Sequence, residues 1–121
     1  MNNSSKKILV VDDDPDILIA IQAMLEDEGY VVEITEKGEY AEQLQAANYP
    51  DLILLDMLLS GKDGREITRL LKNQLDTKHI PIIMLSAHPG AFKETLAAGA
   101  DDFLAKPFDI DMLLAKVEHY L

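Results

Sequence analysis

The chain has 121 residues and no cysteine, and its 11 basic and 22 acidic residues give a formal net charge of −11. This length suits one domain, and the lack of cysteine excludes disulfides, thiolate metal sites and cysteine nucleophiles, which favours a reducing, cytoplasmic compartment. The acidic charge opposes direct binding to nucleic acid, and no apolar run approaches the roughly 18 residues that a membrane-spanning helix needs.

The polar start of the chain leads directly into an apolar run, so we expect a single domain over residues 1–121 that begins with a flexible segment, residues 1–6. Residues 8–11, ILVV, are apolar without alternation, a pattern typical of a strand buried on both faces of a parallel sheet. This strand delivers Asp12 and Asp13 to its carboxyl end. Ligands bind at that edge of open α/β sheets, so the acidic pair is a candidate site.

Asp14 and Pro15 predict the N-cap and first turn of a helix that runs to about Glu28 and ends at Gly29. A core-facing stripe at helical spacing is expected to comprise Ile17, Ala20, Ile21, Met24 and Leu25. Leu18 lies beside this stripe and close to the acids. It is an equally good candidate for a core residue and for a residue on which a partner docks.

Residues 31–35, VVEIT, predict a strand that admits one charge and therefore lies at a sheet edge. A weak helix is expected over residues 38–47. Residues 52–55, LILL, again lack alternation and predict a central strand that ends at the lone carboxylate of Asp56. Because Asp56 lies at the carboxyl edge of the sheet, a functional role is favoured over the alternative that it is an ordinary solvated acid.

The second half of the chain predicts a helix after Gly64, a strand over residues 80–85 that leads to Ser86, a helix over residues 92–98, a strand over residues 102–105 that delivers Lys106, and a helix capped by Asp109. Strands and helices thus alternate along the whole chain. We expect an α/β fold of the flavodoxin-like (βα)5 class, a doubly wound parallel sheet with strand order 2-1-3-4-5.

This topology brings five polar side chains to one cleft, namely Asp12, Asp13, Asp56, Ser86 and Lys106. Mutual repulsion of the three carboxylates would raise their pKa values unless a cation is present, and an all-oxygen set suits Mg²⁺, with Mn²⁺ as the alternative. The loop after the third strand can add a backbone carbonyl, that of Leu58. The implied chemistry is phosphoryl transfer to Asp56, with Lys106 and Ser86 holding phosphoryl oxygens.

Five motifs in this order resemble the receiver domain of two-component response regulators: the acidic pair after ILVV, Asp56, Asp63-Gly64, Ser86 and Lys106-Pro107. The resemblance covers essentially the whole chain. It implies that Asp56 is the phosphoacceptor, Asp13 a direct metal ligand and Asp12 a ligand through water. It also implies that the Ser86 hydroxyl follows the phosphoryl group, that Phe103 is the switch aromatic and that Lys106 is the charge partner of the phosphoryl group.

The same resemblance implies the partners. A sensor histidine kinase or a histidine phosphotransfer protein would donate the phosphoryl group, and a downstream protein would bind the face of the fourth and fifth helices. Such a protein is a monomer or a weak phosphorylation-dependent dimer, and it catalyses only its own phosphorylation and dephosphorylation. The end at Leu121 resembles that of a stand-alone receiver of the chemotaxis or sporulation-relay type, although a boundary before an effector domain stays open.

Two positions depart from the family's pattern. Ser60 replaces the usual proline four residues after the acceptor, which is expected to leave the loop more mobile, and Phe103 replaces tyrosine. The lifetime of an aspartyl phosphate depends on a water that nearby side chains orient, and the residues best placed for this are Leu58 and His88. Leu58 offers that water no hydrogen bond, so slow self-dephosphorylation is expected.

Three other interpretations share part of the pattern. An aspartate-nucleophile phosphatase of the haloacid dehalogenase type would carry its nucleophile on the first strand and needs a longer core. A degenerate receiver that acts only as a docking module would not need all five site residues. A flavodoxin-like nucleotide binder would need glycines and hydroxyls in its first loop, where this chain has aspartates that repel phosphate.

Overall fold

The computed structural model describes residues 6–88 and 90–121, so the segment expected to be flexible over residues 1–6 lies outside the described part apart from Lys6. Five strands form one sheet in the order β2-β1-β3-β6-β7, with every neighbouring pair parallel. Their bounds are β1 Lys7–Val11, β2 Val31–Thr35, β3 Leu52–Asp56, β6 Ile82–Ser86 and β7 Asp102–Ala105. Counted within this sheet alone, the order is the predicted 2-1-3-4-5.

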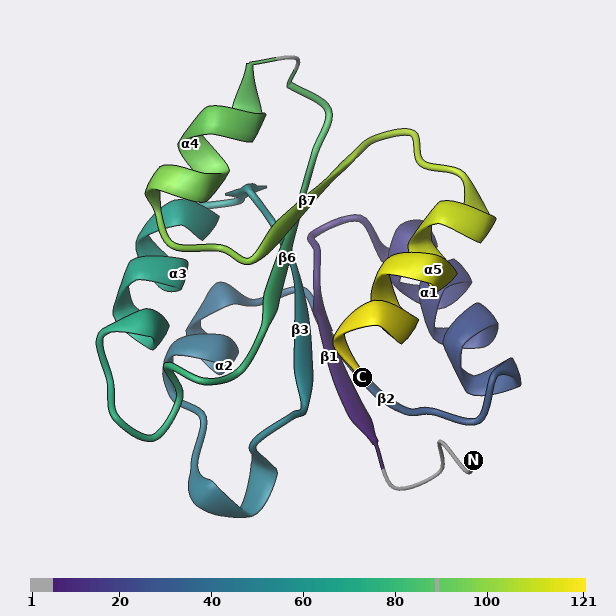
Figure 1. The fold of residues 1–121 in the computed structure, drawn as a ribbon, viewed down its shortest axis with the longest axis horizontal. Coiled ribbons are helices and arrows are strands. Elements are labelled where there is room, and N and C mark those ends of the chain that lie inside the picture. Colours follow the sequence, from purple (N-terminus) through teal and green to yellow (C-terminus); the bar gives the residue numbers. More distant parts are fainter. Residues whose placement is uncertain (1–5, 89) are drawn as a thin grey trace.

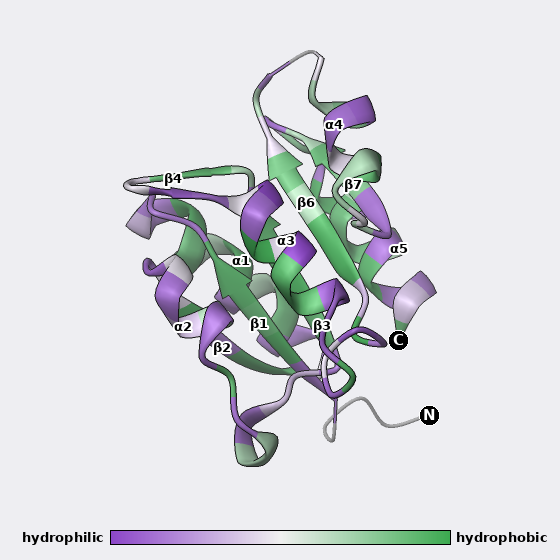
Figure 2. Ribbon diagram, turned by 90° about the vertical axis from the view of Figure 1, so that its left-hand side faces the viewer, coloured by the Kyte–Doolittle hydropathy of each residue, from purple (hydrophilic) through white to green (hydrophobic). Residues whose placement is uncertain are grey.

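Helices cover both faces of the sheet, which makes three layers (Figure 1). One face carries α1 Pro15–Asp27 and α5 Ile110–Tyr120, and the other carries α2 Gly38–Glu42, α3 Gly64–Lys72 and α4 Ala91–Ala97. Each central strand contributes to two cores, since Ile8 and Val10 pack toward α1 and α5 while Leu9 and Val11 pack toward the opposite layer. The central strands are accordingly mainly hydrophobic (Figure 2).

The buried face of α1 differs from the predicted stripe. Leu18, Ile21 and Leu25 are the buried side chains, whereas Ala20 is exposed. Leu18 is only 3% exposed and belongs to the core, so the interpretation of Leu18 as a docking residue is wrong. Helical spacing defines the width of an apolar stripe, but packing against the sheet decides which edge of it faces inward.

The segment after β2 is also less helical than expected. The helix predicted over residues 38–47 ends at Glu42, and a separate 3₁₀ helix, η1, spans Ala46–Asn48. Gln45, between them, has an extended backbone with φ −120° and ψ 159°. Only Gly38 and Ala41 are buried in α2, so little packing is available to stabilise a longer helix.

The loop after β3 contains a hairpin that the sequence did not predict. Strands β4 Leu58–Leu59 and β5 Lys62–Asp63 pair antiparallel around a two-residue turn. Gly61 has a φ of +74° in that turn, a conformation that side chains disfavour. Across residues 6–88 and 90–121, no helix is both long and apolar enough to cross a membrane.

Candidate functional site

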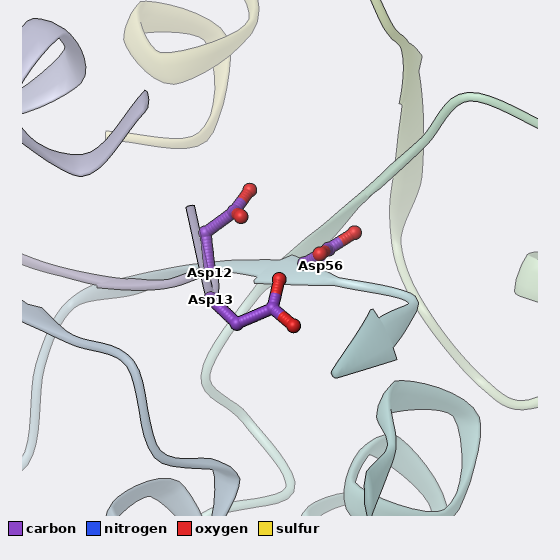
Figure 3. A group of neighbouring side chains, drawn as sticks. All are labelled: Asp12, Asp13 and Asp56. Atoms are coloured by element: carbon purple, nitrogen blue, oxygen red, sulfur yellow. The ribbon is translucent and has the colours of Figure 1, made fainter. Parts of the chain in front are cut away.

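Three carboxylates meet at the carboxyl edge of the sheet. β1 and β3 are adjacent and in register, with Val11 opposite Leu55, so Asp12 and Asp56 emerge side by side. Asp13 follows in the same loop as Asp12, and one carboxylate oxygen from each of the three acids lies within 4.8 Å of the others (Figure 3). The predicted acidic cluster is therefore formed by the fold.

Lys106 is the cation of this cluster. The Lys106 ammonium lies 2.7 Å from Oδ2 of Asp12 and 3.4 Å from Oδ1 of Asp56. Asp12 is fully buried, and its other oxygen, Oδ1, accepts a hydrogen bond of 3.0 Å from the backbone N–H of Asp14. Lys106 follows β7, and its backbone N–H donates to the carbonyl of Ser86 at 2.8 Å, which places it beside the carboxyl end of β6.

One ammonium does not neutralise three acids. Burial, followed by the charge of Asp12, raises the pKa of Asp56 to about 6 although Lys106 opposes the rise. Burial acts to lower the pKa of Lys106, but the hydrogen bond to Asp12 and the charges of both acids outweigh it, so that this pKa is raised. Lys106 therefore stays charged at neutral pH, and Asp56 lies in a field that favours an additional cation.

The donor set fits Mg²⁺. All three acids offer oxygen, which hard divalent cations prefer, and the cluster holds no histidine or thiolate that would favour zinc. The exposed Leu58 lies on β4, immediately beyond the cluster. An acidic pocket of this composition at the edge of a parallel sheet can bind a divalent cation and, through it, an anionic ligand.

Ser86 is adjacent to this cluster, whereas Phe103 is further along the sheet. Ser86 ends β6 next to Asp56, is 3% exposed, and accepts a hydrogen bond of 3.0 Å from the backbone N–H of His88 on its hydroxyl oxygen. Phe103 lies further back on β7, opposite Met84, and its half-buried ring makes an edge-to-face contact with Phe92 of α4 at a centroid distance of 6.1 Å. The structure thus places Ser86 next to Asp56 and the Phe103 ring against α4.

Leu58 and His88 face a common cavity. It has a volume of about 260 Å³ and is lined by Met57, Leu58, Arg65, His88, Gly90, Ala91 and Glu94. Both residues are exposed. The two residues chosen from sequence position alone therefore lie on one cavity, which Met57, the neighbour of Asp56 in the chain, also lines.

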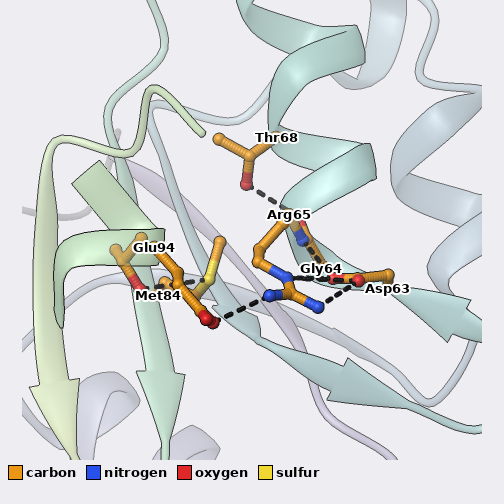
Figure 4. A network of polar contacts seen from close by, with 7 residues as sticks. Asp63, Gly64, Arg65, Thr68, Met84 and Glu94 are labelled. Carbon is orange, nitrogen blue, oxygen red and sulfur yellow. Dashed lines mark hydrogen bonds and ion pairs between the residues drawn. The ribbon is translucent and has the colours of Figure 1, made fainter. Parts of the chain in front are cut away.

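Sequence reasoning did not identify the function of three nearby residues. A Cβ atom at Gly64 would lie 2.4 Å from the backbone oxygen of Asp56, so only glycine fits there. Arg65 bonds both oxygens of Asp63 and also Glu94 on α4 at 2.7 Å, which ties the start of α3 to α4 (Figure 4). Ser60 donates two hydrogen bonds to Asp13. No local pattern marks the long-range contacts, because Glu94 lies 29 positions from Arg65 and Asp13 lies 47 positions from Ser60.

The family model for the response regulator receiver domain matches residues 8–118. The phosphate regulon transcriptional regulatory protein PhoB of Rhizobium meliloti (strain 1021) is 38% identical over 117 residues, which are 95% of this chain and 52% of that protein. The chain thus spans about half the length of this relative.

Solved structures agree with this match. A putative response regulator from Chloroflexus aurantiacus J-10-fl is 34% identical with a TM-score of 0.89, over 95% of this chain and 96% of that chain. The receiver domain of the sensor histidine kinase PA1611 from Pseudomonas aeruginosa PAO1, which has a magnesium ion coordinated in its active site cleft, is 34% identical with a TM-score of 0.86, over 95% of this chain and 96% of that chain. With the fold, the acidic cluster and the family match in agreement, this chain belongs to the family of response regulator receiver domains.

Proposed function

We propose that this chain is the phospho-accepting switch of a two-component system, folded as a single domain, and that Asp56 accepts the phosphoryl group in a Mg²⁺-dependent reaction. The observation that carries the proposal is the setting of Asp56. The residue is 7% exposed, and its carboxylate lies 3.4 Å from an ammonium and shares a potential metal site with two other acids. The repulsion among the three acids does not stabilise the fold, so a purely structural role at the end of a strand does not explain this setting of Asp56.

The metal ligands follow from which oxygens are free. Both oxygens of Asp12 already accept hydrogen bonds, from Lys106 and Asp14, so Asp12 would hold the ion through a water molecule. Asp13, Asp56 and the backbone carbonyl of Leu58 would bind it directly. When bound, Mg²⁺ or Mn²⁺ supplies positive charge that offsets the carboxylates and the incoming phosphoryl oxygens.

The protein's own groups complete the chemistry. A carboxylate oxygen of Asp56 would attack phosphorus while the bond to the donor's leaving atom breaks, which forms an acyl phosphate. Lys106, already 3.4 Å from Asp56, would contact one phosphoryl oxygen. The Ser86 hydroxyl accepts from His88, which leaves its own proton free to donate to another oxygen. Because the chain modifies only itself, it is a switch rather than a classical enzyme.

The switch would act through Phe103. Movement of Ser86 toward the phosphoryl group would let the Phe103 ring swing inward, away from its edge-to-face contact with Phe92 on α4. The face formed by α4 and α5 would change as a result. That face exposes apolar side chains, among them Leu96 and Ile110, which supports binding of a downstream protein there.

The phosphodonor, a sensor histidine kinase or a histidine phosphotransfer protein, is proposed to dock on α1. Because Leu18 is buried, we propose that the phosphodonor contacts a cavity of about 350 Å³ beside α1 instead. The cavity is lined by Ile17, Ala20, Ile21, Met24, Ala87, Lys106, Pro107 and Phe108. Its mostly apolar lining next to the phosphoacceptor suits a helical partner that presents a histidine.

We propose that the chain makes no direct contact with nucleic acid, since the net charge of −11 opposes it. We also propose that it is a monomer or a weak phosphorylation-dependent dimer.

Intact mass after incubation with acetyl phosphate tests this function. Wild type with Mg²⁺ should gain the mass of one phosphoryl group, whereas Asp56→Asn, or wild type in chelator, should gain none. Labelling of the Asn variant would show that another residue accepts the group. A docking module would not be labelled at all, and a phosphatase would consume acetyl phosphate without accumulating the acyl phosphate.

A further inference from the structure

Ser60 links two distant loops of the site. It lies in the turn between β4 and β5, and its backbone N–H and its hydroxyl both donate to Oδ2 of Asp13, at 3.2 Å and 2.9 Å. The described hydrogen bonds to the Asp13 side chain therefore end on one oxygen. The other oxygen, Oδ1, remains available to a cation.

The turn that carries Ser60 is itself held in place. Leu58 pairs with Asp63 and Leu59 pairs with Lys62 across the hairpin, and the Leu59 side chain is only 8% exposed. The Asp63 carboxylate caps α3 through the backbone N–H of Arg65 at 2.9 Å. The same hairpin carries the Leu58 carbonyl, so it would position one metal ligand directly and would support a second ligand, Asp13, through Ser60.

The neutral donors of Ser60 differ in charge from the Lys106 ammonium that donates to Asp12. Lys106 brings a positive charge to Asp12 and so competes with a cation for that carboxylate. The N–H and hydroxyl of Ser60 are neutral, so they restrict the rotation of Asp13 without cancelling the charge that attracts a cation. Hydrogen bonds of this kind to a metal-binding carboxylate typically change metal affinity by about 10- to 100-fold.

We propose that Ser60 is a positioning residue for the metal, which holds Asp13 by Oδ2 so that Oδ1 can bind the ion. This inference rests on the Mg²⁺ site proposed above. Proline, which the family's pattern has at this position, offers neither donor. The departure at Ser60 thus provides support for Asp13 that a proline-containing loop lacks.

Calorimetric titration with MgCl₂ alone, without a phosphodonor, tests this role in four proteins. Ser60→Pro removes both donors but suits the turn, because proline is favoured at the first central position when the second has a positive φ, as Gly61 has. Ser60→Ala removes only the hydroxyl, and Ser60→Thr keeps both donors. We expect the Kd for Mg²⁺ to rise about tenfold or more for the proline variant, less for alanine, and little for threonine.

Urea unfolding in chelator shows whether each variant keeps its fold without metal. If the proline variant is destabilised there, the comparison of Ser60→Ala with Ser60→Thr decides, because both keep the turn. Equal Mg²⁺ affinity in wild type and Ser60→Ala, or tighter binding after loss of the donors, would overturn the positioning role while leaving the Mg²⁺ site intact. Absence of Mg²⁺ binding by wild type would instead refute the proposed function on which this role depends.

Discussion

Replacement of Asp56 by asparagine should stabilise the metal-free protein at neutral pH. Burial and the charge of Asp12 raise the pKa of Asp56 from the ordinary 3.8 to about 6, so the folded protein holds this proton more tightly than the unfolded chain does. The free energy of unfolding therefore falls as the pH rises from about 4 to 6, and the full loss is present above pH 6. At about 1.36 kcal/mol per pH unit, ionised Asp56 destabilises the fold by about 3 kcal/mol at pH 7.5.

Asparagine resembles the protonated acid in shape and lacks its charge. Asp56→Asn should raise the free energy of unfolding by about 3 kcal/mol at pH 7.5 and by only about 1 kcal/mol at pH 4.5, where Asp56 is largely protonated in the folded state. Urea unfolding followed by circular dichroism, in chelator, measures both values. The matched control is Asp76→Asn, which removes an equal charge from an exposed position and should change stability by less than about 0.5 kcal/mol.

Mg²⁺ extends the test. A cation bound among the carboxylates stabilises wild type by mass action, by about 2.7 kcal/mol at 100 times its Kd, and should benefit the asparagine variant much less. The advantage of Asp56→Asn should therefore shrink as Mg²⁺ is added. An asparagine variant that is no more stable than wild type at pH 7.5, or whose advantage is the same at pH 4.5, would refute the electrostatic reasoning.

Four further substitutions test other contacts of the site. Gly64→Ala should lower the free energy of unfolding by about 2 kcal/mol or more in urea, because its Cβ would lie 2.4 Å from the backbone oxygen of Asp56, whereas Gly90→Ala, with open space around it, should have little effect. We expect the phosphoprotein to decay slowly after donor removal. Leu58→Asn should accelerate this decay by placing an amide near the attacking water, and His88→Ala should change it less; fast wild-type decay would contradict this. Ala20→Arg, at the cavity beside α1, should slow phosphotransfer from a partner protein but leave labelling by acetyl phosphate unchanged. Equal slowing in both assays would show damage to the site itself.

Much of the fold could be predicted because its signals are local. The strands Val31–Thr35, Leu52–Asp56 and Asp102–Ala105 begin and end as expected, since short runs rich in apolar residues and bounded by turn residues identify strands within a few positions. The acids of the site could be predicted for the same reason. Asp12 and Asp56 each follow or end such a run, and parallel strands bring their carboxyl ends to one edge.

Other features depended on contacts between residues far apart in the chain. The side of α1 that faces inward, and with it the burial of Leu18, is decided by packing on the sheet. The short α2 reflects the lack of buried side chains to stabilise it. The requirement for glycine at position 64 arises from the approach of the Asp56 carbonyl, and the support of Asp13 by Ser60 joins loops 47 positions apart. Local patterns determine the main strands and helices and the edge that carries the acids, whereas the β4–β5 hairpin, helix rotation, close backbone approach and side-chain support arise only when the elements pack together in three dimensions.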